Sequence, residues 1–177
     1  MIILSQPREA KHRLGTGRMA HLCLSNSALI EGVDFTSDQR VNREIDDPLN
    51  FPVLLFPSSD SIDLSKLNCR ERRALVPNRQ RLIVFVLDGT WKSVRKMIGS
   101  SQNLRRLPAI SFAPATPSAY RIRRQPRPQC YSTIEAIHQV IELFAPDGAD
   151  HSAAARPHDN LLAVFGALVD RQLAYTP

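Results

Sequence analysis

The sequence is poor in cysteine and contains no long uninterrupted run of apolar residues. Its three cysteines, Cys23, Cys69 and Cys130, lie far apart and form no CxxC pair, which argues against a disulfide framework and a cysteine-based zinc site. The longest apolar runs, such as Ile83–Leu87, are far too short to span a bilayer. The N-terminus lacks the basic segment of a secretory signal. These absences favour a protein of the reducing cytoplasm.

Several motifs of common enzymes are also missing. The chain contains no GxGxxG, no GxxxxGK[ST] and no GxSxG, so the usual fingerprints of dinucleotide, P-loop and α/β-hydrolase sites are absent. Its histidines lack partners at metal-ligand spacing, so solvated imidazoles and no metal site are predicted. These histidines are His12, His21, His138, His151 and His158.

What is present suits one folded domain over residues 1–177. The chain has 43% hydrophobic and 23% charged residues, a composition that can bury a core and excludes global disorder. Residues 146–177 are predicted to form a polar hinge followed by a last helix. The composition leaves the oligomeric state open.

Charge is strongly segregated along the chain. The segment from Lys66 to Cys130 has fifteen basic residues against only Glu71 and Asp88, a net charge of +13, whereas the rest of the chain carries −7. A solvated basic surface is one interpretation. The abundance of arginine favours a polyanionic partner, because the guanidinium group matches phosphate oxygens.

The hydrophobic pattern alternates between strands and helices. The Arg81–Leu87 segment is apolar on both faces, as in a central parallel strand. A helix is expected after it, capped by Thr90. The alternation predicts an α/β fold with an open, mostly parallel sheet and helices on both faces. The other expected strands are Ile2–Ser5, Pro52–Phe56 and Ala109–Phe112, and the other expected helices are 16–24 (capped by Thr16), 133–144 and 161–174, with a short helix or loop within 31–50.

Three strand ends carry unusual residues. Phe56 and Pro57 end one strand, and Asp88 ends the central one. A proline-rich stretch, residues 113–131, follows a third strand and leads into Ser132 and Thr133. Ligands of open α/β sheets bind at the carboxyl ends of the strands, so a site is expected here.

Asp88 and Trp91 each allow two interpretations. Asp88 could take a proton or orient a ligand amine, or it could only bond the amides of its own turn. The cationic residues after the turn are expected to favour its ionised form. Trp91 could stack on a base or on adenine, or it could fill the interface between sheet and helix. Lys92, Arg95 and Lys96 share one helix face, which would contact either phosphates or water.

The order of these motifs resembles the DTW-domain family. The signature is Asp88–Trp91 after an apolar strand, and further segments match in the same order over about residues 2–145. These segments are Pro7–Ala10, Gly15–Arg18, Leu55–Pro57, Leu107–Pro108, Tyr120–Pro126 and Ser132–Ala136. The chain departs from many members in lacking an N-terminal cysteine cluster, and Gln6 stands where a histidine is usual.

The resemblance implies a fold, an activity and a set of site residues. The family resembles tRNA-uridine aminocarboxypropyltransferases related to knotted, SPOUT-type enzymes. A knotted C-terminal region would bind S-adenosylmethionine (SAM), and the 3-amino-3-carboxypropyl group would move to N3 of a uridine in tRNA. No metal is required. The implied catalytic residues are Asp88, Thr90 and Trp91. The implied donor-binding residues are Phe56, Pro57, Asp88, Trp91, Tyr120, Ser132 and Thr133. The implied RNA-binding residues are Arg18, Lys92, Arg95, Lys96, Arg121, Arg123 and Arg124, of which Arg18 or Arg124 could instead hold the donor's carboxylate.

Two other functions fit the same residues. One is methyl transfer to RNA from the same donor, which differs only in the carbon presented to the base. The other is a non-catalytic RNA-binding module. Such a module would keep the basic segment but would not need Asp88 and Trp91 together at a strand end.

Overall fold

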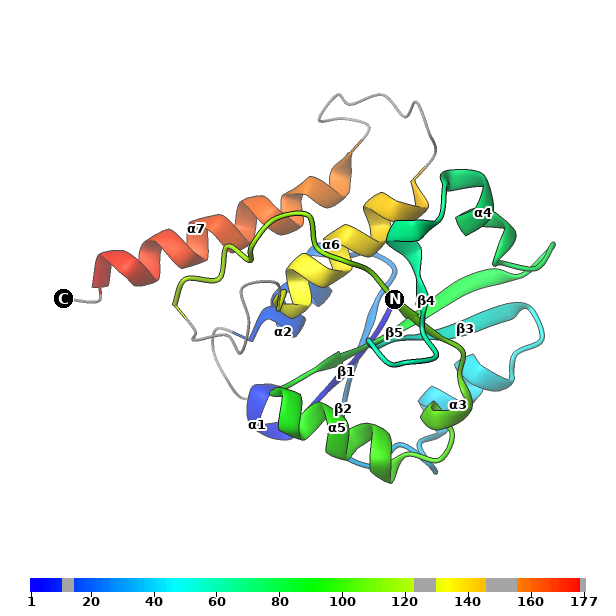
Figure 1. Cartoon of the computed structure of the whole chain (residues 1–177). Coiled ribbons are helices and arrows are strands. Elements are labelled where there is room, and N and C mark those ends of the chain that lie inside the picture. Colours follow the sequence, from blue (N-terminus) through cyan, green and yellow to red (C-terminus); the bar gives the residue numbers. More distant parts are fainter. Residues whose placement is uncertain (11–14, 123–129, 146–155, 176–177) are drawn as a thin grey trace.

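The computed structural model describes residues 1–10, 15–122, 130–145 and 156–175, and these form one parallel sheet between two layers of helices (Figure 1). The strands lie in the order β2-β1-β5-β3-β6-β4, and every neighbouring pair is parallel. The predicted α/β class and parallel sheet are therefore confirmed. The strands are β1 (Ile2–Ser5), β2 (Ala28–Glu31), β3 (Asn50–Leu55), β4 (Ile62–Asp63), β5 (Arg81–Asp88) and β6 (Ala109–Ser111).

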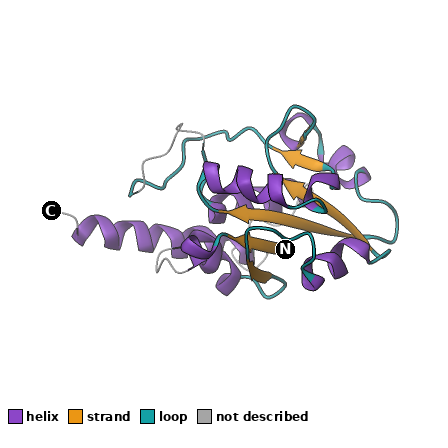
Figure 2. Ribbon diagram, turned by 90° about the horizontal axis from the view of Figure 1, so that it is seen from below, coloured by secondary structure: helices purple, strands orange, loops and turns teal. Residues whose placement is uncertain are grey.

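Helices cover both faces of this sheet. One layer holds α2, α6 and α7, and the other holds α3 and α5 (Figures 1 and 2). None of the described helices is long and apolar enough to cross a membrane. The α-helices are α1 (Pro7–Ala10), α2 (Thr16–Cys23), α3 (Gln39–Asp46), α4 (Cys69–Ala74), α5 (Trp91–Ser100), α6 (Thr133–Phe144) and α7 (Asn160–Tyr175), and the 3-10 helices are η1 (Leu64–Lys66), η2 (Leu104–Arg106) and η3 (Pro157–Asp159).

Strand β5 is apolar from Leu82 to Leu87 because this stretch contributes to two cores. Val84 and Val86 belong to the core under α2, α6 and α7, whereas Phe85 and Leu87 belong to the core under α3 and α5. Successive side chains of a strand point to opposite faces, so a strand covered on both sides must be apolar at every position. Burial on both faces holds the strand's carboxyl end, at Asp88, in a fixed place.

Proline occurs inside β3 without breaking the sheet. Pro52 pairs with Ile83 of β5, but β6 pairs with β3 only at Leu54 and Leu55. One side of β3 therefore has no neighbouring strand at Pro52, and no ladder hydrogen bond is lost there.

Several predicted boundaries shift, and the strands β2 and β4 and the helices α1 and α4 were missed. Helix α2 begins at Thr16, and its N-cap is Gly15, so the prediction that Thr16 caps it is wrong. The helix within 31–50 is α3, whose N-cap Asp38 accepts hydrogen bonds from the first helical turn. Most of the predicted hinge lies outside the described residues.

Candidate functional site

A cavity of about 360 Å³ lies at the carboxyl ends of β3, β5 and β6. This is the edge where a parallel sheet is expected to bind its ligands. Helices α5 and α6 begin beside it and contribute their first turns. The lining residues are Leu55, Phe56, Pro57, Val86, Leu87, Gly89, Trp91, Val94, Ser111, Phe112, Pro114, Cys130, Tyr131, Thr133 and Ala136.

Aromatic rings form two walls of the cavity. The ring centroids of Phe56 and Trp91 lie 6.4 Å apart, and those of Phe112 and Tyr131 lie 5.8 Å apart. Trp91 keeps 37% of its surface exposed, so it does not fill the interface between sheet and helix. The cavity therefore offers flat apolar surfaces to a ring-shaped ligand.

The proline-rich stretch reaches this cavity from both described ends. Pro114 lines it from the segment after β6, and Cys130 and Tyr131 line it from the segment before α6. Gly89 of the central turn lines the same cavity. The two ends of the stretch thus lie at the turn that contains Asp88, while residues 123–129 lie outside the described part.

The Asp88 carboxylate is buried and joins three separate segments. Only 4% of the residue is exposed. Oδ2 accepts a hydrogen bond from Ser5 Oγ at 2.9 Å, and Oδ1 accepts one from Thr133 Oγ1 at 2.6 Å. The backbone N–H of Gly17 is a third donor. The carboxylate thus bonds the end of β1 and the starts of α2 and α6, and not only the amides of its own turn.

Burial raises the pKa of Asp88 above the ordinary aspartate value. Glu9 acts in the same direction, whereas the hydrogen bonds from Thr133, Ser5 and Gly17 act against it. The expectation that the nearby cations would favour the ionised form is wrong. Loss of solvent dominates at this position, since a buried carboxylate loses much of its hydration.

Only glycine fits at position 17. A Cβ atom built there would lie 2.5 Å from Cγ of Asp88 and 2.6 Å from its Oδ2. The missing side chain lets the first turn of α2 approach the carboxylate closely enough to donate its amide. The sequence signal was the Gly15–Gly17 segment, which marked a motif but not its contact with Asp88.

The structure separates the predicted donor-binding residues into three groups. Phe56, Pro57, Trp91 and Thr133 line the cavity, and Asp88 lies behind Thr133. Two others are not among the lining residues. Tyr120 packs edge-on against Phe165 of α7, with ring centroids 5.3 Å apart, and Ser132 binds Glu135. Thr90 caps α5, since its side-chain oxygen accepts a hydrogen bond from the backbone amide of Ser93.

Glu135 anchors the proline-rich stretch to the start of α6. It is only 6% exposed. Its carboxylate accepts hydrogen bonds from Ser118 Oγ, the Ala119 amide, and both the amide and the hydroxyl of Ser132 at 2.6–2.8 Å. Sequence reasoning noticed Glu135 only as part of a motif. Its role depends on contacts across the loop, which no local pattern reveals.

Other site residues were also missed by sequence reasoning. Phe112 was predicted only as the end of a strand, and Ser5 only as part of the first strand. Phe112 lines the cavity, and Ser5 binds Asp88. Both residues stand at strand ends, and that position was the available signal.

The predicted RNA-binding residues are mostly exposed cations. Lys92, Arg95 and Lys96 lie on the solvent side of α5, while Val94 and Met97 are buried. Arg18 is exposed on α2, directly after Gly17. Arg121 forms an ion pair with Asp170 of α7 at 3.2 Å, and Arg123 and Arg124 lie outside the described residues.

Two histidines differ from the expectation of solvated imidazoles. His138 and His158 lie beside Glu142 and Asp159, with most of each imidazole buried. His21 contacts Ser27 Oγ, and His12 and His151 lie outside the described residues.

Comparison with known proteins identifies similar chains. The family described as the DTW domain matches residues 1–173. The chain is 29% identical over 149 residues to tRNA-uridine aminocarboxypropyltransferase 2 of Drosophila melanogaster, and the match covers 81% of this chain and 55% of that protein. It is 27% identical over 176 residues to tRNA-uridine aminocarboxypropyltransferase A of Arabidopsis thaliana, covering 85% of this chain and 64% of that protein. The chain thus spans less than two thirds of either relative's length. No solved structure matches it.

Proposed function

Since this chain belongs to the DTW domain family, we propose that it works in the cytoplasm and transfers a 3-amino-3-carboxypropyl group from SAM to N3 of a uridine in tRNA. The observation that carries this proposal is the aromatic-walled cavity beside buried Asp88 at the carboxyl ends of the central strands. Two relatives named tRNA-uridine aminocarboxypropyltransferase support the transfer of this group to a uridine of tRNA.

The cavity suits the donor in size and in chemistry. Its volume of about 360 Å³ lies within the range of small-molecule sites, about 300–1,000 Å³. Phe56, Pro57 and Trp91 would hold the adenine between apolar surfaces. Thr133 and the start of α6 would face the polar end of the donor.

The donor would supply a sulfonium that activates the aminocarboxypropyl carbon bound to its sulfur. N3 would attack this carbon, so that the C–N bond forms as the C–S bond breaks and methylthioadenosine leaves. A base must accept the N3 proton. We assign this role to Asp88 acting through Thr133, a residue of the cavity lining whose hydroxyl donates to Oδ1 at 2.6 Å. Thr133 would accept the uridine proton as it passes its own to Asp88. The raised pKa of Asp88 favours this step, because a stronger base accepts a proton more readily.

The tRNA would approach along α5. The exposed cations of α5 begin one residue after Trp91. A phosphate backbone held by Lys92, Arg95 and Lys96 would therefore bring a base to the cavity. Arg18, Arg121, Arg123 and Arg124 would extend this contact. Charge attraction of this kind does not depend on base sequence, so it positions the RNA without choosing the uridine.

We further propose that the region from residue 113 through α6 is threaded as a SPOUT-type knot around the donor. The contacts of Glu135 with Ser118 and Ala119 support a loop fixed against α6. An experimental structure with donor bound and residues 123–129 traced would test this threading.

The product of the donor distinguishes the proposed reaction from its alternatives. Purified protein would be incubated with SAM and unmodified tRNA, and the small-molecule products would be separated by chromatography and mass spectrometry. Aminocarboxypropyl transfer yields methylthioadenosine together with a uridine heavier by the transferred group.

S-adenosylhomocysteine in its place would mean methyl transfer and would overturn the proposal. Calorimetry with SAM provides the companion measurement. Failure to bind the donor, together with retained tRNA binding, would leave only an RNA-binding module.

A further inference from the structure

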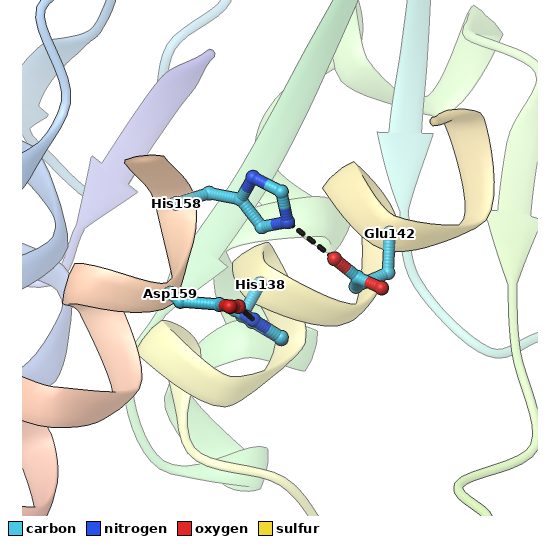
Figure 3. Close-up of side chains that lie close together, drawn as sticks. All are labelled: His138, Glu142, His158 and Asp159. Atoms are coloured by element: carbon cyan, nitrogen blue, oxygen red, sulfur yellow. Dashed lines mark hydrogen bonds and ion pairs between the residues drawn. The ribbon is translucent and has the colours of Figure 1, made fainter. Parts of the chain in front are cut away.

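A second group of chemically reactive side chains lies away from the cavity, where α6 meets η3 (Figure 3). His138 and Glu142 are four residues apart on α6 and therefore lie on one helix face. His158 and Asp159 are consecutive residues of η3. One ligand atom from each of the four lies within 4.8 Å of all the others.

These side chains already pair across the two elements. His138 Nε2 lies 2.9 Å from Asp159 Oδ1, and His158 Nε2 contacts Glu142 Oε1 (Figure 3). The two imidazoles are 11% and 13% exposed. Each carboxylate oxygen thus faces a ring nitrogen in a partly dehydrated site.

Arginine supplies a positive charge at the same place. Arg156 Nη2 lies 2.8 Å from Glu142 Oε1 and 3.1 Å from Asp159 Oδ1, and its Nε lies 2.8 Å from Asp159 Oδ2. One guanidinium nitrogen therefore contacts the very oxygens that face the imidazoles. A cation between the two carboxylates stabilises this arrangement.

We propose that His138, Glu142, His158 and Asp159 form a binding site for a divalent transition metal, with Zn²⁺ as the best match. Two imidazole nitrogens and two carboxylate oxygens are ligands that zinc accepts, and four of them complete a closed tetrahedral site. A bound zinc ion holds such ligands at about 2.0–2.2 Å, which places them roughly 3.4 Å apart. The cluster at 4.8 Å is close to that size and needs only a modest contraction.

Metal binding rearranges two sets of contacts in the cluster. The ion takes the place of the hydrogen atom between each Nε2 and its carboxylate, so each imidazole binds it as the neutral tautomer with its proton on Nδ1. It also displaces the Arg156 nitrogen from the two carboxylate oxygens. The guanidinium can keep its contact with Asp159 Oδ2 and hold that ligand from outside.

The site would have a structural role that is independent of the proposed transfer reaction. None of its four ligands is among the residues that line the cavity. The ion would join α6 to η3, which lie at opposite ends of the segment 145–156, and η3 leads directly into α7. Metal binding is therefore measured without SAM or tRNA, and its failure would say nothing about the transfer.

The experiment is a zinc titration of the tag-free, full-length chain after treatment with a chelator. Competition with a chromophoric chelator gives the affinity, and the melting temperature is recorded with and without Zn²⁺. We expect one tightly bound ion per chain and a higher melting temperature. His158→Ala and Glu142→Gln should each weaken the affinity by at least about 100-fold, since even residues outside the ligand shell are worth about 10- to 100-fold.

Two further variants make the result decisive. His21→Ala removes a histidine that bonds Ser27 elsewhere, so the affinity should not change. Arg156→Met removes the competing cation, so Zn²⁺ should bind more tightly if the four ligands form the site. This variant also tests the proposal should the ligand variants fail to fold.

Either of two outcomes would overturn the proposal. One is the absence of stoichiometric zinc binding in both the unaltered chain and Arg156→Met, which would make the cluster an ion-pair network only. The other is zinc binding that His158→Ala and Glu142→Gln leave unchanged, which would put the ion elsewhere, for example on the free cysteines.

Discussion

At the scale of single residues, the position of Asp88 combines burial with three hydrogen-bond donors from distant segments. The sequence could predict that this carboxylate ends a buried strand, because six apolar residues precede it. It could not predict Ser5, Gly17 and Thr133 as partners, because these contacts join residues between 45 and 83 positions apart. For the same reason the direction of its pKa was misjudged, since desolvation depends on tertiary packing.

The first prediction concerns the chemistry of Asp88. Asp88→Asn keeps the size of the side chain, and the hydroxyls of Ser5 and Thr133 can rotate to serve the new amide. Turnover should fall by roughly 10²–10⁴-fold, the usual contribution of a general base, while calorimetry should find donor affinity retained. Thr133→Val should reduce turnover similarly if the proton passes through its hydroxyl. A loss of donor affinity in Asp88→Asn would instead mean that the carboxylate binds the donor's ammonium. Normal turnover would mean that Asp88 has only a structural role.

A second prediction follows from the raised pKa of Asp88. The folded protein holds this proton more tightly than the unfolded chain, so stability is greatest when the carboxyl is neutral. This contribution to stability is lost as the pH rises from the pKa of Asp88 in the unfolded chain, about 3.9, through its pKa in the folded protein. Asp88→Asn cannot lose a proton there, so its stability relative to the unaltered chain should increase with pH across this window. Urea unfolding at several pH values measures the stability of both proteins. If the two stabilities change with pH in parallel, the raised pKa of Asp88 is contradicted.

The third prediction concerns the close approach at Gly17. Gly17→Ala places a methyl group within 2.5 Å of the Asp88 carboxyl carbon, so the first turn of α2 or the carboxylate must move. Stability and turnover should both fall, although alanine is otherwise the better helix former. Gly166→Ala in α7 is the matched control. Nothing lies within 4 Å of its Cβ position, so the free energy of unfolding of that variant should increase by up to about 1 kcal/mol. Equal effects of the two substitutions in urea unfolding would remove the steric argument.

At the scale of elements, strong local patterns predicted the structure best. The strands β1 and β5 and the helices α5, α6 and α7 match expectation because each has a clear apolar pattern. The edge strand β2 escaped notice because its four residues carry too short a pattern, and the helix α4 because its six residues are mostly charged. The two described ends of the proline-rich stretch line the cavity as predicted, yet the contact that fixes its residues 118 and 119 is made by a buried glutamate at the start of α6.

Glu135 therefore carries the prediction for this element. Glu135→Ala removes the acceptor of four hydrogen bonds from residues 118, 119 and 132. Stability should fall by about 2–4 kcal/mol, because buried donors are left without partners. Donor affinity should fall as well, since Tyr131 and Thr133 of the cavity wall stand on either side of Ser132, which Glu135 binds.

Glu71→Ala is the control for this change. Glu71 completes the capping box of α4 with Asn68, so its loss should lower stability by about 0.5–2 kcal/mol without changing donor affinity. If Glu135→Ala folds and binds SAM as tightly as the control does, the loop is not a wall of the donor site.

At the scale of the whole molecule, the basic segment of the sequence does not form a single surface. The basic segment includes α4 and α5, which lie on opposite faces of the sheet: α4 packs against α6, whereas Val94 and Met97 of α5 enter the other core. Composition could predict a polyanionic partner but not which of these faces meets it. Only the position of Trp91 in the cavity, at the start of α5, favours that helix.

The last prediction tests this choice of face. Binding of tRNA should weaken steeply with salt, because neutralised phosphates release their counterions. Replacing Lys92, Arg95 and Lys96 with glutamine should flatten the log–log salt dependence by roughly one unit for each lost phosphate contact. Arg70 and Arg73, exposed on α4, provide the matched control: their replacement with glutamine removes positive charge from the opposite face and should leave the slope nearly unchanged. Filter-binding or fluorescence titrations at several salt concentrations measure the slopes. An equal reduction per removed charge by the two sets would mean that net charge alone attracts the RNA, and a reduction only by the α4 set would move the binding surface away from the cavity.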